Sequence, residues 1–349
     1  MVDGSQRPHA LPRGDVNAVR VALEGADAIL VADYGRGMTH GTDLRELLRA
    51  AASLVPMVWD PHPDSGAPVP GVAVATPNHH EARAFAPDLA GSSLAGDIAR
   101  AGRLVADWQV RHVAVTRGEE GVVLMSGPAG VPLVVPARRI THADASGAGD
   151  HFAVATTAGL AAGNLVSEAI TSAVAATSEH LAGESTSASE RFPVAAGEPV
   201  DELVRRVRAG GGRVVAAGGC FDLLHVGHVT MLGNARQLGD CLIVLLNSDR
   251  STRALKGPSR PVVPEQDRAR MLQALTCVDG VVIFDEPSPA AVIERLRPDL
   301  FVKGADYGLD AILERDVVER VGGQVVVVPY LSGRSTTSMI HEVGQGTVP

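Results

Sequence analysis

The chain has 349 residues, of which 45% are hydrophobic, 20% are charged and 3% are aromatic, and its formal net charge is −9. A chain of this size and composition belongs to the soluble globular class and can bury two hydrophobic cores. The acidic charge and the few aromatic side chains exclude a basic stripe or a stacking surface for nucleic acid. No apolar run is long enough to cross a bilayer and the first residues lack a signal-peptide core, so no membrane partner is expected.

The chain contains three cysteines, Cys220, Cys241 and Cys277. They show neither the close spacing of a metal site nor the even number of a disulfide framework. A reducing cytoplasm is the compartment that this cysteine usage favours.

The first predicted strand spans residues 28–31, after a polar and irregular opening. The main chemical signal of the first half is Asp144-Ala145-Ser146-Gly147-Ala148-Gly149-Asp150, which directly precedes an apolar helix predicted over 152–160. Glycines at a helix start place backbone amides around an anion such as a phosphate. Asp150 lies in the first turn, where a carboxylate can take the proton of a hydroxyl group that attacks ATP. The alternative is a glycine-rich N-cap with an Asp that only stabilises the helix.

Three further segments accompany this motif. They are Asp33-Tyr34-Gly35-Arg36-Gly37, Thr76-Pro77-Asn78-x-x-Glu81 and Val115-Thr116-Arg117-Gly118-x-x-Gly121. Together with the Gly147 to Asp150 motif, they resemble the signature segments of the ribokinase-family (PfkB) sugar kinases. Ala145 and His151 depart from the residues expected beside that signature.

The resemblance implies an α/β kinase domain that uses ATP and Mg²⁺ as cofactors. By that resemblance Asp150 would be the catalytic base, and Asn78 and Glu81 would act near the metal ion and the phosphate. The residues that it implies to line the nucleotide are Thr116, Gly118, Gly121, Gly147 and Gly149.

Ribokinase-like domains begin with strands that supply a sugar-binding Asp, a Gly-Gly motif that ends in Asn and a small lid sheet. No such segment precedes Asp33, whereas a fold of this type runs to roughly 250–300 residues. We therefore expect residues 1–182 to form an amino-terminally truncated ribokinase-like domain whose kinase site is inactive or impaired.

Residues 183–212 are predicted to connect two domains. The stretch 183–199 is rich in Ser, Ala, Glu and Pro, a short helix is predicted over 200–209, and three glycines at 210–212 follow it. A second domain is then expected over residues 213–345.

The second domain alternates short β-branched runs with helical segments. The expected strands cover residues 213–217, 241–246, 278–284, 299–302 and 324–328. This alternation is typical of a Rossmann-like, doubly wound parallel sheet, in which ligands bind beyond the carboxyl ends of the strands. Polar motifs directly follow these runs, so we expect them to converge at one edge of the sheet.

The most informative motif, Gly218-Gly219-Cys220-Phe221-Asp222-Leu223-Leu224-His225-Val226-Gly227-His228, joins the first of these strands to a helix predicted over 230–238. The helix start offers backbone amides and a positive dipole end to a nucleotide phosphate, and Gly227 permits close approach. His225 and His228 can donate hydrogen bonds to α-phosphate oxygens as negative charge develops in the transition state. The alternative is two ordinary histidines that cap a helix.

This motif resembles the signature of the HxGH cytidylyltransferase-like nucleotidyltransferases, which join a nucleoside triphosphate to a phosphorylated small molecule and release pyrophosphate. Four later segments match the same series: Asn247-Ser248-Asp249, Leu255 to Pro261, Val302 to Tyr307 and Ser335 to Ser338. Over residues 213–343 the series is similar to the adenylyltransferase half of the bifunctional heptose 7-phosphate kinase/heptose 1-phosphate adenylyltransferase family.

The chemistry of these side chains suggests separate roles. Lys256 is a mobile point charge suited to the β- and γ-phosphates that leave as pyrophosphate, or else a solvated loop lysine. Asp222 orients its loop or a Mg²⁺-bound water, whereas Arg268 is a weak candidate that an ordinary exposed charge would explain equally well. The hydroxyls of Ser335 to Ser338 also fit a helix N-cap. The other residues implied to bind nucleotide or sugar are Gly219, Phe221, Asn247, Asp249, Lys303, Asp306, Arg334, Ser335, Thr336 and Thr337.

We therefore expect a cytoplasmic adenylyltransferase that transfers AMP from ATP to a small-molecule sugar phosphate, D-glycero-β-D-manno-heptose 1-phosphate. Two alternatives stay open. One is cytidylyl or adenylyl transfer to another phosphorylated alcohol such as glycerol 3-phosphate, which product analysis distinguishes. The other is a first half that serves as a homodimerisation module, which size-exclusion chromatography of each half distinguishes.

Overall fold

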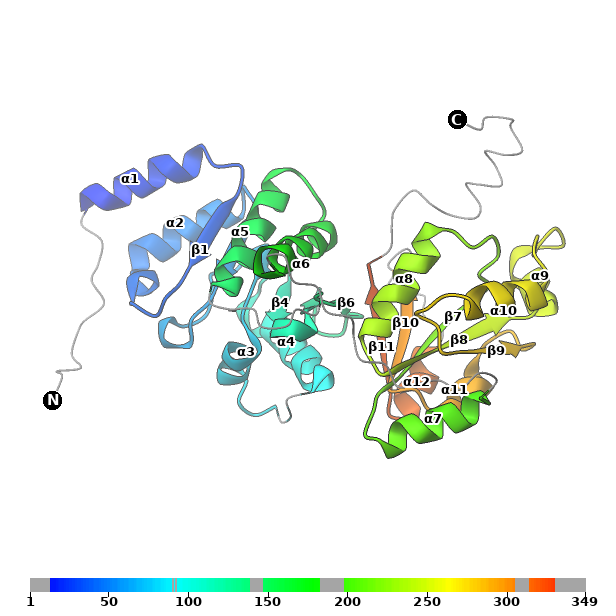
Figure 1. Ribbon diagram of the computed structural model, residues 1–349. Helices are drawn as coiled ribbons and strands as arrows, with labels where there is room; N and C mark the ends of the chain where they lie inside the picture. Colours follow the sequence, from blue (N-terminus) through cyan, green and yellow to red (C-terminus); the bar gives the residue numbers. More distant parts are fainter. Residues whose placement is uncertain are drawn as a thin grey trace, which may run out of the picture. The chain divides into compact units, whose positions relative to one another are not determined.

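A computed structural model describes residues 13–89, 91, 93–138, 147–182, 198–304 and 314–329. The chain forms two compact units, Met1–Ala188 and Ser189–Pro349, and each has an α/β fold (Figure 1). This confirms the fold class expected from the sequence.

The first unit is built on a sheet whose strands lie side by side in chain order. The first four strands are parallel, and the last two run antiparallel to their neighbours. The strands are β1 (Ile29–Ala32), β2 (Met57–Asp60), β3 (Val74–Ala75), β4 (Val113–Thr116), β5 (Val122–Met125) and β6 (Leu133–Val135). Side chains of the central strands are buried, as expected for a sheet covered by helices on both faces.

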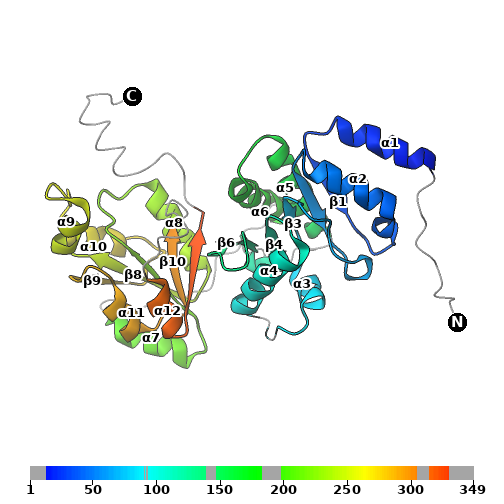
Figure 2. The same ribbon diagram turned by 180° about the vertical axis from the view of Figure 1, so that it is seen from behind.

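Helices cover this sheet on both faces, with α3 and α4 on one side and α5 and α6 on the other (Figures 1 and 2). In α4, Ala101, Leu104, Val105 and Trp108 are buried at helical spacing, so one stripe of the helix packs on β4 and β5. The helices are α1 (Arg13–Glu24), α2 (Thr42–Ala52), α3 (His79–Phe85), α4 (Leu94–Trp108), α5 (Ala148–Ala161) and α6 (Val166–Ala182), with short 3₁₀ turns η1 (Met38–His40), η2 (Pro63–Ser65) and η3 (Gly118–Glu120).

The second unit has a fully parallel sheet in the order β11-β10-β7-β8-β9. Every residue of β8 is buried, because helices pack over the sheet. The strands are β7 (Val214–Gly219), β8 (Cys241–Asn247), β9 (Gly280–Phe284), β10 (Leu300–Gly304) and β11 (Gln324–Val328). The chain winds outward from β7 through β8 to β9 and then returns to the other side of β7, so the switch point lies between β7 and β10. A ligand site is expected beyond the carboxyl ends of these two strands.

The helices of the second unit lie on both faces of this sheet, with α8 on one side and α7, α11 and α12 on the other (Figures 1 and 2). The helix expected over 200–209 is α7. Its buried Leu203, Val204 and Val207 pack on this sheet, so α7 is part of the second unit and more than a connection between the two units. The helices are α7 (Val200–Ala209), α8 (Val226–Gln237), α9 (Asp249–Lys256), α10 (Glu265–Gln273), α11 (Ala290–Leu296) and α12 (Arg315–Arg320). Within the described residues of both units, no helix is long and apolar enough to span a membrane.

Candidate functional sites in the two units

In the second unit, the loop between β7 and α8 brings two histidine rings into contact. His225 is the N-cap residue of α8 and His228 lies in its first turn, and their rings stack with centroids 3.8 Å apart. The rings of Phe221 and His228 have centroids 5.3 Å apart, and the backbone of Phe221 is in the left-handed region with φ of 46°. A non-glycine residue adopts such a conformation only when its surroundings hold it there. The loop is therefore shaped to present both rings at the helix start.

His228 is held neutral by its surroundings. Burial, together with the positive charges of His225 and Lys256, lowers the pKa of His228 to about 4. A neutral imidazole carries one N–H donor and one acceptor nitrogen. The Nδ1 atom of His228 is buried and has no hydrogen-bond partner among the described residues. Lys256, the exposed last residue of α9, is thus close enough to act electrostatically on the same site.

Asp222 holds a neighbouring loop in place. Its carboxylate accepts hydrogen bonds from Arg260 Nε at 2.5 Å, from the Val262 amide at 2.9 Å and from the Val263 amide at 3.1 Å. Burial alone raises the pKa of Asp222, but these hydrogen bonds outweigh burial and lower the pKa overall. Of the two roles expected for Asp222, the described contacts supply the one that orients a loop.

Arg268 differs most from the sequence expectation, because its side chain is 0% exposed. The exposed-charge interpretation is therefore wrong. Its guanidinium donates to the carbonyl oxygens of Cys220 at 2.5 Å, Asn247 at 2.9 Å and Val263 at 2.9 Å, and it forms an ion pair with Asp249 at 2.8 Å. Arg268 thus joins the loops that follow β7 and β8 to α10. Sequence reasoning could not identify this role, since only the fold shows which way α10 faces.

Asn247 and Asp249 are also engaged in contacts within the protein. Asn247 Nδ2 donates to Ser251 Oγ at 2.9 Å, and Asp249 Oδ1 accepts the amide of Glu265 at 2.8 Å. Asn247 ends β8 and Asp249 begins α9, so both lie at the carboxyl edge of the sheet, where the sequence places them. Their described contacts support the loops around the histidines, and their binding of nucleotide stays a prediction.

The remaining residues predicted for this site lie partly outside the described residues. Gly219 lies at the end of β7, where a Cβ atom would come within 3.1 Å of the Phe221 ring, and Gly227 is buried in α8. Lys303 is the last residue but one of β10 and forms an ion pair with Glu314 at 2.9 Å. The predicted residues outside the described part are Asp306, Arg334, Ser335, Thr336 and Thr337.

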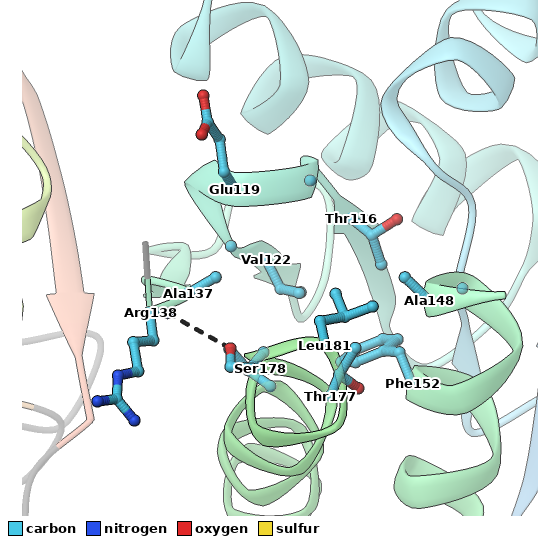
Figure 3. A pocket seen from close by; sticks show the side chains of 14 residues that line it. Thr116, Glu119, Val122, Ala137, Arg138, Ala148, Phe152, Thr177, Ser178 and Leu181 are labelled. Carbon is cyan, nitrogen blue, oxygen red and sulfur yellow. Dashed lines mark hydrogen bonds between the residues drawn. The ribbon is translucent and has the colours of Figure 1, made fainter. Parts of the chain in front are cut away.

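The first unit contains a cavity of about 300 Å³ that four of its predicted nucleotide residues line. Apolar side chains from α5 and α6 face a polar loop across it (Figure 3). Mostly apolar lining with a few polar groups is typical of a small-molecule site. The lining residues are Thr116, Gly118, Glu119, Gly121, Val122, Ala137, Arg138, Ala148, Gly149, Phe152, Val174, Thr177, Ser178 and Leu181.

Asp150 lies in the first turn of α5, and Gly147 is the N-cap with φ of 78°. Tyr34 donates its hydroxyl hydrogen to Asp150 Oδ1 at 3.1 Å, which connects the segment after β1 to this helix start. The predicted base and the nucleotide cavity therefore share one helix, because Ala148 and Gly149 line the cavity.

Asp60, which the sequence analysis did not single out, is a further titratable group near Asp150. Burial is the main cause that raises the pKa of Asp60 to about 7. The negative charges of Glu81, Asp150 and Asp33 act in the same direction, and a hydrogen bond from Thr76 at 2.9 Å opposes them. A carboxyl group with such a pKa is a functional-site candidate. The only signal for it in the sequence is an Asp directly after the short apolar run Met57-Val58-Trp59.

Asn78 and Glu81 form a capping box at the start of α3. The Asn78 side chain accepts the amides of His80 and Glu81, while Glu81 Oε2 accepts the Asn78 amide at 2.8 Å. No group of three His, Cys, Asp or Glu side chains in the described ranges is arranged to hold a metal ion. Mg²⁺ commonly takes one or two carboxylates and completes its shell with water and substrate phosphates. Glu81 fits such a partial set, and its role at a metal stays a prediction.

Comparison with known proteins identifies both halves. The pfkB family carbohydrate kinase model matches residues 21–191, and the cytidylyltransferase-like model matches residues 216–338. In solved structures, a lipopolysaccharide core biosynthesis protein from Thermoplasma volcanium is 29% identical over 35% of this chain and 98% of its own, with a TM-score of 0.31. A ribokinase from Arabidopsis thaliana is 18% identical over 51% of this chain and 56% of its own, with a TM-score of 0.39.

Curated relatives span both halves at once. The Bifunctional protein HldE of Streptomyces coelicolor is 47% identical over 96% of this chain and 73% of its own length. The protein of the same name from Pelobacter propionicus is 37% identical over 91% of this chain and 68% of its own length. The chain therefore belongs to the bifunctional HldE family, as an enzyme with a sugar kinase domain and a nucleotidyltransferase domain.

Proposed function

We propose that the second unit transfers AMP from ATP to D-glycero-β-D-manno-heptose 1-phosphate, giving ADP-heptose and pyrophosphate. The observation that carries this proposal is the stacked His225–His228 pair at the start of α8, beside the switch point of a parallel sheet. The similarity to HldE proteins supports the choice of heptose as the sugar. We place this reaction in the cytoplasm, where ATP is available.

In the proposed reaction an oxygen of the sugar phosphate attacks the α-phosphorus of ATP. A new P–O bond forms there while the bond to the β-phosphate oxygen breaks, and pyrophosphate leaves. The attacking oxygen is already anionic, so the protein need not supply a general base. Mg²⁺ bound to the triphosphate would offset part of its negative charge.

The residues of this unit position the reacting groups and donate hydrogen bonds to them. Neutral His228 donates one N–H bond to an α-phosphate oxygen, and His225 does the same from the N-cap position. Lys256 acts on the departing pyrophosphate as a point charge. Arg268 and Asp222 act indirectly, because their contacts hold the loops on which these groups stand.

We propose for the first unit that its cavity binds ATP, that Asp150 is the base of sugar phosphorylation and that Asn78 and Glu81 act near Mg²⁺. We also propose that kinase activity is weak in this chain. Tyr34 and Met38, in the segment beside Asp150, are 60% and 57% exposed. Few of the described side chains would therefore surround a sugar next to Asp150. Its hydroxyl would be held less firmly near ATP, so the rate gain from proximity would be small.

The test incubates the purified chain with Mg²⁺-ATP and heptose 1-phosphate, and separately with heptose 7-phosphate, while pyrophosphate and ADP are followed. Pyrophosphate release that depends on heptose 1-phosphate, with little sugar-dependent ADP, is the expected result. Pyrophosphate release with CTP and glycerol 3-phosphate, but not with ATP and heptose 1-phosphate, would overturn the substrate assignment. Strong ADP release with heptose 7-phosphate, abolished by Asp150→Asn, would overturn the proposal of a weak kinase.

A further inference from the structure

One wall of the cavity in the first unit is a tight turn between β4 and β5. The turn comprises η3 and Gly121, and Gly118, Glu119 and Gly121 all line the cavity (Figure 3). The Arg117 amide donates to the Gly121 carbonyl at 2.8 Å, and the Gly121 amide donates to the Gly118 carbonyl at 3.1 Å. These two bonds fix the shape of the turn but do not fix its position relative to the rest of the unit.

The Arg117 side chain fixes the position of the turn relative to α4. Arg117 is not among the residues that line the cavity; its side chain is 5% exposed and donates from Nε to Asp97 Oδ2 at 2.8 Å. A second nitrogen of the same group pairs with Glu120 at 2.5 Å. One guanidinium therefore joins the last residue of η3 to the first turn of α4.

Asp97 is anchored on its own side as well. Its carboxylate is 3% exposed, lies in the first turn of α4 and also pairs with Arg100 at 3.2 Å. Arg100 in turn donates to the carbonyl oxygens of Leu89 and Gly91, in the turn that precedes α4. Buried charges are tolerated when each is paired and hydrogen-bonded. The two carboxylates and two guanidinium groups balance in charge, so the cluster can be rigid.

We propose that Asp97 and Arg117 are positioning residues for nucleotide binding in the first unit. Their ion pair fixes the 118–121 turn against α4, which itself packs on β4 and β5. The wall is then in place before the ligand arrives, and less ordering is required on binding. The inference rests on the proposal that this cavity binds a nucleotide, and neither side chain touches the ligand.

Hydrogen–deuterium exchange with increasing ADP tests this in the full chain, because peptides over 117–122 and 147–152 report only on the first unit. Asp97→Asn plus Arg117→Gln removes the ion pair, while Arg100 keeps its hydrogen bonds to the carbonyl oxygens of Leu89 and Gly91. We expect faster exchange of the 118–121 amides without ligand and roughly tenfold weaker ADP binding. Peptides within β4 and β5 should keep wild-type protection. Arg117→Lys, which keeps the charge opposite Asp97, should restore part of the affinity.

The matched control is Arg103→Gln, which breaks an exposed ion pair with Asp107 farther along α4 and should leave ADP binding unchanged. If ADP protects neither peptide in the wild-type chain, the nucleotide cavity itself is refuted. If it protects them equally in wild type and double variant, the positioning role is refuted. Loss of protection across β4 and β5 in the double variant would also refute it, because the ion pair would then serve general stability. If the double variant does not fold, Arg117→Lys decides. Faster exchange of the 118–121 amides with weaker ADP binding supports the positioning role, and exchange and binding equal to those of wild type refute it.

Discussion

At the scale of single residues, the two stacked histidines make the most direct prediction. If each donates a hydrogen bond to the α-phosphate in the transition state, His225→Ala or His228→Ala should lower turnover by about 10²–10³ while ATP affinity changes less. Pyrophosphate release and ATP binding measure these two effects separately. His80→Ala, at an exposed histidine of the first unit, is the control. Turnover close to that of wild type in both single variants would exclude the assignment.

Lys256 should act on the triphosphate rather than on the sugar phosphate. Lys256→Ala is therefore expected to weaken ATP use, seen as a lower kcat/KM for ATP, far more than it raises the KM for heptose 1-phosphate. Arg253→Ala removes another exposed cation from the same helix and should have little effect. A Lys256→Ala variant that is defective only in sugar phosphate affinity would place this residue at the acceptor side.

Asp60 makes a prediction about stability and pH. Since the pKa of Asp60 is raised to about 7, the folded protein retains a proton that the unfolded chain releases above about pH 4. Stability therefore falls as the pH rises from about 4 to about 7. Asp60→Asn should raise the melting temperature of the first unit at pH 8, and the gain should shrink toward pH 4. Asp64→Asn, at an exposed carboxylate nearby, should show no such pH-dependent gain.

At the scale of elements, the turn between β4 and β5 has no room for a side chain at Gly121 but has room for one at Gly118. A Cβ atom at Gly121 would lie 2.0 Å from the Val135 carbonyl oxygen, whereas nothing lies within 4 Å of one at Gly118. We expect Gly121→Ala to destabilise the first unit by about 3 kcal/mol or more, because backbone must shift. Gly118→Ala should cost only about 1 kcal/mol, since φ is +60° but the space is open. Thermal unfolding of both variants measures the difference, and equal losses would contradict it.

Elements were predictable from the sequence where local pattern alone determines them. The β-branched runs at 241–246 and 324–328 form β8 and β11 within one residue at each end, and the helix expected over 200–209 is α7. The helix expected over 230–238 starts earlier, at Val226, because His225 acts as its N-cap. Local pattern could not show how distant elements meet, and this is why the burial of Arg268 and the cluster around Asp97 were missed. The histidine pair was foreseen because both residues lie within one short motif.

At the scale of the whole molecule, the two chemistries should be separable, because the chain divides into two compact units that each have a buried core. Asp150→Asn should leave pyrophosphate release with heptose 1-phosphate unchanged. His228→Ala should leave ADP-dependent protection of the 147–152 peptide unchanged. Together the two measurements report one site from each unit. A large effect of either variant on the other site would show that the units are coupled.

The ion pair between Lys303 and Glu314 has a consequence for how this enzyme family can diversify. It ties the end of β10 to the residue just before α12, and residues 305–313 lie between these two anchors. The ion pair therefore fixes where the chain leaves β10 and where it enters α12. Because the two side chains are only 11% and 12% exposed, loss of either charge would deprive the other of a nearly buried partner, so the two positions should change together among relatives.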